Sequence, residues 1–368
     1  MTSLRTPLCE LLGIEVPILQ SGMGGVAGPE LAAEVCRAGG LGILAGLNVP
    51  ADALRSQIGR LRALTDRPFG VNLWLHEAMQ PPVDVRSLPA ADVAGAQAEL
   101  NRFRAELGIA PRTDGPDPIP DLIEAQLDVV LEERVPALSI GLGDPRHERV
   151  VRCRQRGVLV MAMATTVDDA RVLQDSGVDV LVAQGGEAGG HRSTWVKPSS
   201  ASSASVGTMA LVPEMVDAVR VPVVAAGGIA DGRGLVAALA LGAQGVLLGT
   251  RFVATRESSA ASFFKQAILD GKANDTRVTD VFTGLHARGI DNRFIGEYEA
   301  SGAPVLPPLA QRNLAQDVYA AARAKGDREH FPMLAGQSLG MIRDLPGAAD
   351  VVRSIIEEAE RVLRRLAP

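Results

Sequence analysis

Two glycine-rich turns in the second half of the chain have the residue types of a phosphate-binding site. They are Ala225-Ala226-Gly227-Gly228-Ile229 and Leu248-Gly249-Thr250-Arg251, and each follows a short apolar run. Glycine lets backbone N–H groups converge on an anion. The alternative is that these glycines only permit tight packing between a strand and the next helix. If the two apolar runs are the last strands of a barrel, phosphate binding is favoured, because barrels commonly bind phosphate there.

A third glycine-rich segment carries a histidine. Gln184-Gly185-Gly186-Glu187-Ala188-Gly189-Gly190-His191 follows another apolar run. His191 is therefore a candidate acid, base or hydrogen-bond donor to a substrate, and a step that titrates near neutrality should depend on it. The alternative is a solvated loop histidine. Glu187 and His191 would supply only two metal ligands, and no third ligand has suitable spacing, so the sequence predicts no metal site.

Asn72 is a polar residue inside the apolar run Val71-Asn72-Leu73-Trp74. A buried amide needs hydrogen-bond partners. The polar edge of a flat cofactor ring would provide them, and the alternative is an asparagine that caps the next turn.

The segment Gly22-Met23-Gly24-Gly25-Val26-Ala27 matches the G-x-G-x-x-A pattern of dinucleotide-binding folds. That pattern also requires an acidic residue about 20 positions later to bind the ribose. Here the corresponding segment is Ala45-Gly46-Leu47-Asn48, without a carboxylate. A glycine-lined platform that a flat ring can approach closely is the favoured interpretation.

These segments require a scaffold of parallel strands. Short apolar runs recur, each followed by a turn and a stretch of helical periodicity, which is the alternation of a parallel sheet buried on both faces. Eight such runs favour a closed (β/α)8 TIM barrel over an open doubly wound sheet. The predicted strands are Val16–Gln20, Leu41–Ala45, Phe69–Trp74, Ala137–Ile140, Val158–Ala162, Val180–Ala183, Val221–Ala225 and Gly245–Leu248.

Two stretches interrupt the alternation, and together they predict a mainly helical cap. Residues 76–118 contain one helical pattern, Ala91–Leu107, and residues 256–335 show no strand signal. The barrel would then consist of residues 1–75, 119–255 and 336–368. The last segment, Ala348–Leu366, has an apolar stripe at spacings of three and four and is expected to be the eighth barrel helix. Ser199–Ser205 is a serine-rich loop, interpreted as a linker rather than a lid.

Composition excludes several classes of protein. The chain has 368 residues, of which 46% are hydrophobic, so it has enough apolar material for a large core. A net charge of −6 gives no basic footprint for nucleic acid. No apolar run reaches the roughly 18 residues of a membrane span. The N-terminus lacks a signal-peptide core, and the three cysteines have no metal or redox spacing, so we expect a cytoplasmic protein.

In their order along the chain, these motifs resemble the nitronate monooxygenase (2-nitropropane dioxygenase) family. The resemblance runs from about residue 5 to 255, and Ala335-Gly336-Gln337 looks like a further family element. It implies an FMN-containing barrel with a helical cap, and His191 remains the catalytic candidate. The implied cofactor contacts are Gly22, Met23, Asn72, Gln184, Gly189, Gly190, Gly227, Gly228, Leu247, Leu248, Gly249, Thr250 and Gln337.

The resemblance implies a cofactor more firmly than a reaction. The first hypothesis is oxidation of an alkyl nitronate by O2 to a carbonyl compound and nitrite. The second is NAD(P)H-dependent reduction of a quinone or an enoyl thioester, and the third is a flavin- or phosphate-binding module without turnover. Some nitroalkane-oxidising relatives have a catalytic histidine at the end of the fifth strand, where this chain has Ala162-Met163-Ala164. An already anionic nitronate needs no such base.

Overall fold

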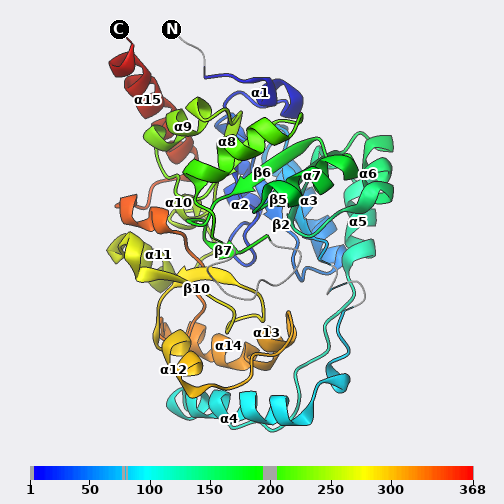
Figure 1. Ribbon diagram of the computed structural model, residues 1–368, viewed down its shortest axis with the longest axis vertical. Coiled ribbons are helices and arrows are strands. Elements are labelled where there is room, and N and C mark those ends of the chain that lie inside the picture. The colour runs from blue at the N-terminus through cyan, green and yellow to red at the C-terminus, as the bar shows by residue number, and fades with distance from the viewer. Residues whose placement is uncertain (1–3, 77–78, 80–81, 194–204, 368) are drawn as a thin grey trace.

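Eight parallel strands form a barrel at one end of the molecule (Figure 1). The computed structural model describes residues 4–76, 79, 82–193 and 205–367. All eight predicted strands are confirmed, and each end lies within two residues of its predicted position. The strands are β1 (Ile18–Gln20), β2 (Ile43–Ala45), β3 (Gly70–Trp74), β4 (Ala137–Leu142), β5 (Leu159–Ala164), β6 (Val180–Gln184), β8 (Val223–Ala226) and β9 (Gly245–Leu248).

The barrel closes between β1 and β2. The strand order is β1-β9-β8-β6-β5-β4-β3-β2, and a parallel bridge joins Leu19 to Leu41 across the remaining seam. The Gln20 side chain strengthens this seam, because its Oε1 accepts from the Ile43 N–H at 3.1 Å and its Nε2 donates to the Ile43 carbonyl at 3.1 Å. The side-chain amide of Gln20 thus adds hydrogen bonds between β1 and β2, which have few backbone hydrogen bonds to each other.

Helices surround the barrel and bury apolar stripes on it. Inside the barrel, a cluster of strand side chains that includes Leu19, Met161 and Leu247 packs with the short helix α1 (Pro7–Leu12). The surrounding helices are α2 (Pro29–Arg37), α3 (Ala51–Leu64), α5 (Ile123–Glu132), α6 (Arg146–Gln155), α7 (Val167–Ser176), α8 (Thr208–Ala218), α9 (Gly232–Ala240) and α15 (Ala348–Leu366).

The C-terminal helix α15 has the predicted bounds and packs against α9 and α2. Val351, Val352, Ile355 and Ala359 of its apolar stripe are buried, whereas Leu366 is exposed at its end. The expectation of an eighth barrel helix delayed by an insertion is therefore confirmed.

The insertions form a second body of structure, seen at the lower end of Figure 1. Its helices share an apolar core, separate from that of the barrel, in which Phe103, Phe282, Phe294 and Tyr319 are in contact. These elements are η1 (Val85–Ser87), α4 (Ala90–Glu106), α12 (Arg293–Ser301), α13 (Ala310–Leu314) and α14 (Gln316–Lys325). The other helical elements of the described residues are α10 (Thr250–Val253), α11 (Ser262–Asp270), η3 (Ala273–Asp275) and η4 (Gln337–Met341).

The expectation that residues 256–335 contain no strand is wrong. β10 (Thr276–Thr279) pairs antiparallel with β11 (Ala287–Ile290), and β11 pairs with β7 (Gly190–His191) from the barrel loop. Both longer strands have four residues and include an arginine, so they lack the apolar run that marks the barrel strands. Their partner comes from a distant part of the chain. This small sheet joins the loop that carries His191 to the cap.

The helices of the described residues include none that is long and apolar enough to cross a membrane. The serine-rich stretch 199–204, interpreted as a linker, lies outside the described residues.

Candidate active site

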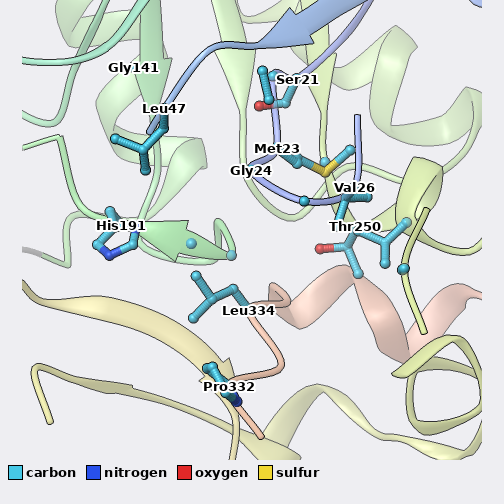
Figure 2. Close-up of a pocket in the computed structure, with 18 of the residues that line it drawn as sticks. Ser21, Met23, Gly24, Val26, Leu47, Gly141, His191, Thr250, Pro332 and Leu334 are labelled. Atoms are coloured by element: carbon cyan, nitrogen blue, oxygen red, sulfur yellow. The ribbon is translucent and has the colours of Figure 1, made fainter. Parts of the chain in front are cut away.

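A cavity of about 530 Å³ lies between the carboxyl ends of the barrel strands and the cap. Figure 2 shows Ser21, Met23 and Thr250 of the barrel on one side of it and Pro332 and Leu334 on the other. Every residue predicted for the site lines this cavity except Gln337. These lining residues are Gly22, Met23, Asn72, Gln184, Gly189, Gly190, His191, Gly227, Gly228, Leu247, Leu248, Gly249 and Thr250.

Gln337 begins the turn η4, and its backbone N–H donates to the Glu187 carbonyl at 2.9 Å. That anchoring leaves the next residue, Ser338, in the cavity wall. The motif Ala335-Gly336-Gln337 therefore acts through its backbone. Gly336 packs so closely on the Glu187 carbonyl that a Cβ there would approach the oxygen to 2.5 Å.

The two glycine turns form an N–H cradle at one end of the cavity. Gly227 and Gly228 have φ values of 105° and 71°, which L-residues with side chains rarely adopt. The backbone N–H groups of Gly227, Gly228 and Gly249 donate to no acceptor among the described residues. Unpaired backbone N–H groups on a cavity wall are suited to bind an anion.

Glu187 holds this cradle together. Its Oε2 accepts from the Thr208 hydroxyl at 2.7 Å and from the Thr208 N–H at 2.9 Å, while the same hydroxyl contacts the Gly227 carbonyl at 3.0 Å. The carboxylate is thus already hydrogen-bonded. Among the described residues there is no group of three or more His, Cys, Asp or Glu side chains that could hold a metal ion.

Asn72 forms the adjoining wall. Its Nδ2 donates to the carbonyl and the hydroxyl of Ser139 on β4, both at 3.2 Å, so the alternative of a cap on the following turn does not apply. Its Oδ1 accepts from no described residue. Gly22 packs on this side chain, and a Cβ on Gly22 would lie 2.3 Å from the Asn72 Cβ. The glycine platform and the Asn72 side chain are therefore packed directly against each other.

Gln184 positions the loop that carries the candidate catalytic residue. Its Nε2 donates to the His191 carbonyl at 2.8 Å, and its Oε1 accepts from the Ser193 N–H at 2.9 Å. Because Gln184 ends β6, this pair of hydrogen bonds fixes the returning strand β7 relative to the barrel. One N–H of the Gln184 amide remains for a ligand.

His191 lies against the cavity rather than in solvent, so the alternative of a solvated loop histidine is wrong. Its Nε2 is 2.8 Å from the Thr283 hydroxyl, and its ring packs edge-on against Trp74 with centroids 4.6 Å apart. Burial, with the nearby cationic Arg312, lowers the pKa of His191 from 6.5 to about 3. The ring is therefore neutral at pH 7 and offers one donor and one acceptor.

The end of the fifth strand contributes Met163, whose buried side chain lines the cavity. It cannot remove a proton, as the sequence already indicated. The cap residues of the cavity wall that escaped sequence reasoning include Thr283, Arg312 and Tyr319. They follow no predicted strand, so no strand-end signal marks them. Trp74, by contrast, ends β3 and was identifiable on that ground.

Residues 5–358 match the nitronate monooxygenase family. Among curated proteins, a probable nitronate monooxygenase of Staphylococcus saprophyticus is 36% identical over 367 residues, with 98% of this chain and 99% of that protein covered. A probable nitronate monooxygenase of Staphylococcus aureus is 34% identical over 365 residues, with 98% and 99% covered.

Solved structures give the same picture. A nitroalkane oxidase from Streptomyces ansochromogenes superposes with a TM-score of 0.87 at 37% identity, covering 98% of this chain and 99% of that one. FabK from Thermotoga maritima superposes with a TM-score of 0.75 at 31% identity, covering 98% of both chains. Both superpositions extend over nearly the whole chain, the barrel and the cap included.

Proposed function

Because the chain belongs to the nitronate monooxygenase family, a family of flavin-dependent oxidoreductases, we propose that it binds FMN and oxidises alkyl nitronates. O2 is the co-substrate, and the products are a carbonyl compound and nitrite. The observation that carries this proposal is the cradle of unpaired glycine N–H groups in the same cavity as a neutral histidine.

The cradle fits the phosphate of FMN. Gly227, Gly228, Gly249 and Thr250 present backbone at the ends of β8 and β9, the usual phosphate position in a barrel. The Thr250 hydroxyl accepts from the Gly336 N–H at 2.9 Å, which holds the cap segment against the cradle. A single compact anion site, with no acidic residue for an adenosine ribose, favours FMN over FAD.

The remaining wall fits a flat ring. Gly22, Met23 and Asn72 would contact the ring face and edge, with the free Asn72 Oδ1 accepting from a ring N–H. Gly189 and Gly190 would border its other side. A Cβ on Gly189 would come within 2.3 Å of the Gly336 N–H, so this loop already packs as closely as glycine allows. Gln184 would add one hydrogen bond, and Leu247 and Leu248 would lie toward the phosphate side.

When bound, FMN supplies the electron transfer and the reaction with O2. The residues of this chain position the nitronate. Neutral His191 would hydrogen-bond one oxygen of the anion with a ring N–H or through Thr283. At the end of the fifth strand, where some relatives have a catalytic histidine, Met163 provides an apolar surface. The substrate must therefore bind already deprotonated. The cap covers the cavity and limits the access of water.

The test is a stoichiometric assay of the FMN-loaded protein with ethyl nitronate in air. We expect the rates of nitrite release and of O2 consumption to be proportional to the enzyme concentration. The kcat should be about 1–1000 s⁻¹, which is typical of enzymes. Released flavin should chromatograph as FMN. The controls are free FMN at the same concentration and the flavin-free protein. Nitrite release no faster than with free FMN would overturn the proposal.

The similarity to FabK supports one second candidate, NAD(P)H-dependent reduction of a quinone or an enoyl thioester. The same preparation distinguishes the two. NAD(P)H oxidation that depends on an added quinone or enoyl thioester, without nitrite release from ethyl nitronate, would establish the second candidate in place of the first.

A further inference from the structure

The hydrogen bond between His191 and Thr283 joins two residues that both line the cavity (Figure 2). The His191 Nε2 lies 2.8 Å from the Thr283 hydroxyl oxygen. Because the imidazole is neutral at pH 7, it carries one N–H, either on Nε2 or on Nδ1. In the first case the ring offers a ligand an acceptor, and in the second case it offers a donor. The position of this proton therefore decides how His191 can act on a ligand.

The Thr283 hydroxyl has one proton and two acceptors within reach. Besides the His191 Nε2, it approaches the Leu285 carbonyl at 3.3 Å. Leu285 is buried, and no other donor among the described residues reaches its carbonyl. The hydroxyl can donate to this carbonyl only if it accepts a proton from Nε2 instead of donating to it.

The two tautomers differ in the number of hydrogen bonds that they allow. With the proton on Nε2, the ring donates to the Thr283 hydroxyl and the hydroxyl donates to the Leu285 carbonyl. With the proton on Nδ1, the hydroxyl donates to Nε2, and the carbonyl loses its donor. The Nδ1–H would then have no acceptor among the described residues. Buried polar groups are rarely left unpaired, and consecutive hydrogen bonds strengthen each other, so the Nε2–H tautomer is favoured.

Both partners of this hydrogen bond are held in place. The His191 ring packs edge-on against Trp74, and the His191 carbonyl accepts from the Gln184 Nε2 at 2.8 Å. The Thr283 carbonyl accepts from the Leu309 N–H at 2.8 Å. The ring cannot leave the hydroxyl without breaking these contacts.

We propose that Thr283 is a positioning residue that fixes the neutral ring of His191 in its Nε2–H tautomer. Nδ1 is then the ring nitrogen left for a ligand, and it can only accept a hydrogen bond. Of the two contacts open to an anionic substrate, a ring N–H or the Thr283 hydroxyl, the second is selected. The hydroxyl can turn to the anion from its long hydrogen bond with the Leu285 carbonyl. This last step rests on the proposed function, whereas the tautomer does not.

The tautomer is measured by long-range 1H–15N correlation NMR on 15N-histidine-labelled protein at pH 7, with and without FMN. Protonated and bare nitrogens of a neutral imidazole have well separated 15N shifts. The chain has five histidines, and the spectrum of His191→Ala identifies the signals of His191. We expect a protonated Nε2 and a bare Nδ1 in the wild type. Thr283→Val, which removes the hydroxyl and keeps nearly the same volume, should populate both tautomers, and Thr283→Ser should retain the wild-type pattern.

The matched control is Thr279→Val. Thr279 is also buried in the cap, but its hydroxyl donates to Glu299 at 2.7 Å and it lies outside the cavity wall. This variant should change neither the tautomer nor the kcat/KM for ethyl nitronate. Thr283→Val should lower that kcat/KM about 10–100-fold, the range for a hydrogen bond to a charged group. Thr283→Ser, which keeps the donor, should lower it much less.

The wild-type spectrum alone tests the tautomer, even if Thr283→Val does not fold. A protonated Nδ1 in the wild type overturns the proposal, and so does an unchanged tautomer in Thr283→Val. The expected tautomer with an unchanged kcat/KM in Thr283→Val would refute the hydroxyl as the donor to the anion. The expected tautomer in a wild type that releases no nitrite would contradict the proposed function and leave the assignment of the tautomer standing.

Discussion

At the scale of single residues, burial decides what His191 can do. The sequence indicated an acid, a base or a hydrogen-bond donor, and a role in any step that titrates near neutrality. Its position beside Trp74 and Arg312 removes water and adds a positive charge, and both effects disfavour the imidazolium. With its pKa lowered to about 3, His191 is neutral at pH 7, so we propose that it acts as a hydrogen-bonding group and not in proton transfer.

This assignment predicts the kinetics of His191→Ala. The variant should keep FMN, and its kcat/KM for a nitronate should fall roughly 10–100-fold, the cost of one hydrogen bond to an anion. The wild-type kcat/KM should show no inflection from this histidine between about pH 6 and 8. An inflection near pH 6.5 that disappears in His191→Ala would contradict the neutral role.

The same lowered pKa links pH to stability. The folded His191 stays neutral while the unfolded one gains a proton below its ordinary value of 6.5, so the unfolded state binds more protons as the pH falls from 6.5 toward 3. The free energy of unfolding of the flavin-free wild type should therefore fall between pH 7 and 4.5. In His191→Asn this fall should be smaller, by up to about 2 kcal/mol. Urea unfolding at both values measures this difference.

The residues found from sequence and those missed differ in a physical respect. Asn72, Gln184 and the glycines lie at the ends of apolar runs, so the local sequence predicts that they stand at the carboxyl ends of strands. Arg312 and Thr283 reach the cavity only because the cap folds back onto the barrel. Their local sequence resembles that of any surface helix or turn, and only long-range packing places them beside His191.

At the scale of elements, the glycine turn after β8 tolerates a side chain poorly, because Gly227 and Gly228 both have positive φ. Gly228→Ala forces a side chain onto a φ of +71° beside Glu187, at a cost of about 1–2 kcal/mol. We expect FMN to bind roughly 5–30-fold more weakly, with a smaller loss for riboflavin, which lacks the phosphate. Fluorescence titration of both flavins measures this change.

A matched control is Gly59→Ala, because Gly59 lies within the helix α3 and a Cβ at this position would have no neighbouring atom within 4 Å. Alanine there should raise stability by about 0.5–1 kcal/mol and leave flavin binding unchanged. Equal losses for FMN and riboflavin in Gly228→Ala would show that the turn does not hold the phosphate.

Element prediction succeeded where local pattern and final structure agree. The barrel strands are apolar on both faces, and α15 was predicted with its observed bounds because its apolar stripe marks it. The strands β10 and β11 failed this criterion. These two segments form strands because they pair with each other and because β11 also pairs with β7. No property of either segment alone specifies that pairing.

At the scale of the whole molecule, we propose two lobes. The barrel lobe consists of residues 1–75, 119–255 and 336–368, and the cap of residues 76–118 and 256–335. Each has its own apolar core, and the cavity wall draws on both. The β7–β11 pairing and the hydrogen bond between His191 and Thr283 cross between them. A ligand in the cavity therefore contacts both lobes at once.

This arrangement predicts the pattern of hydrogen exchange when FMN is added to the flavin-free protein. At a concentration of about 100 Kd, FMN stabilises the folded state by about 2.7 kcal/mol. The slowing of exchange should be largest at the cavity wall of both lobes, around residues 22–26 and 227–229 of the barrel and 309–323 of the cap. Amides of α6, on the outside of the barrel, should change least, because their local openings do not involve the cavity. Riboflavin lacks the phosphate, so it should slow the hydrogen exchange of residues 22–26 and 309–323 but not that of residues 227–229.

If FMN slowed exchange only in the barrel segments, the cap would not contact the cofactor. The proposal of a site shared by two lobes would then have to be abandoned.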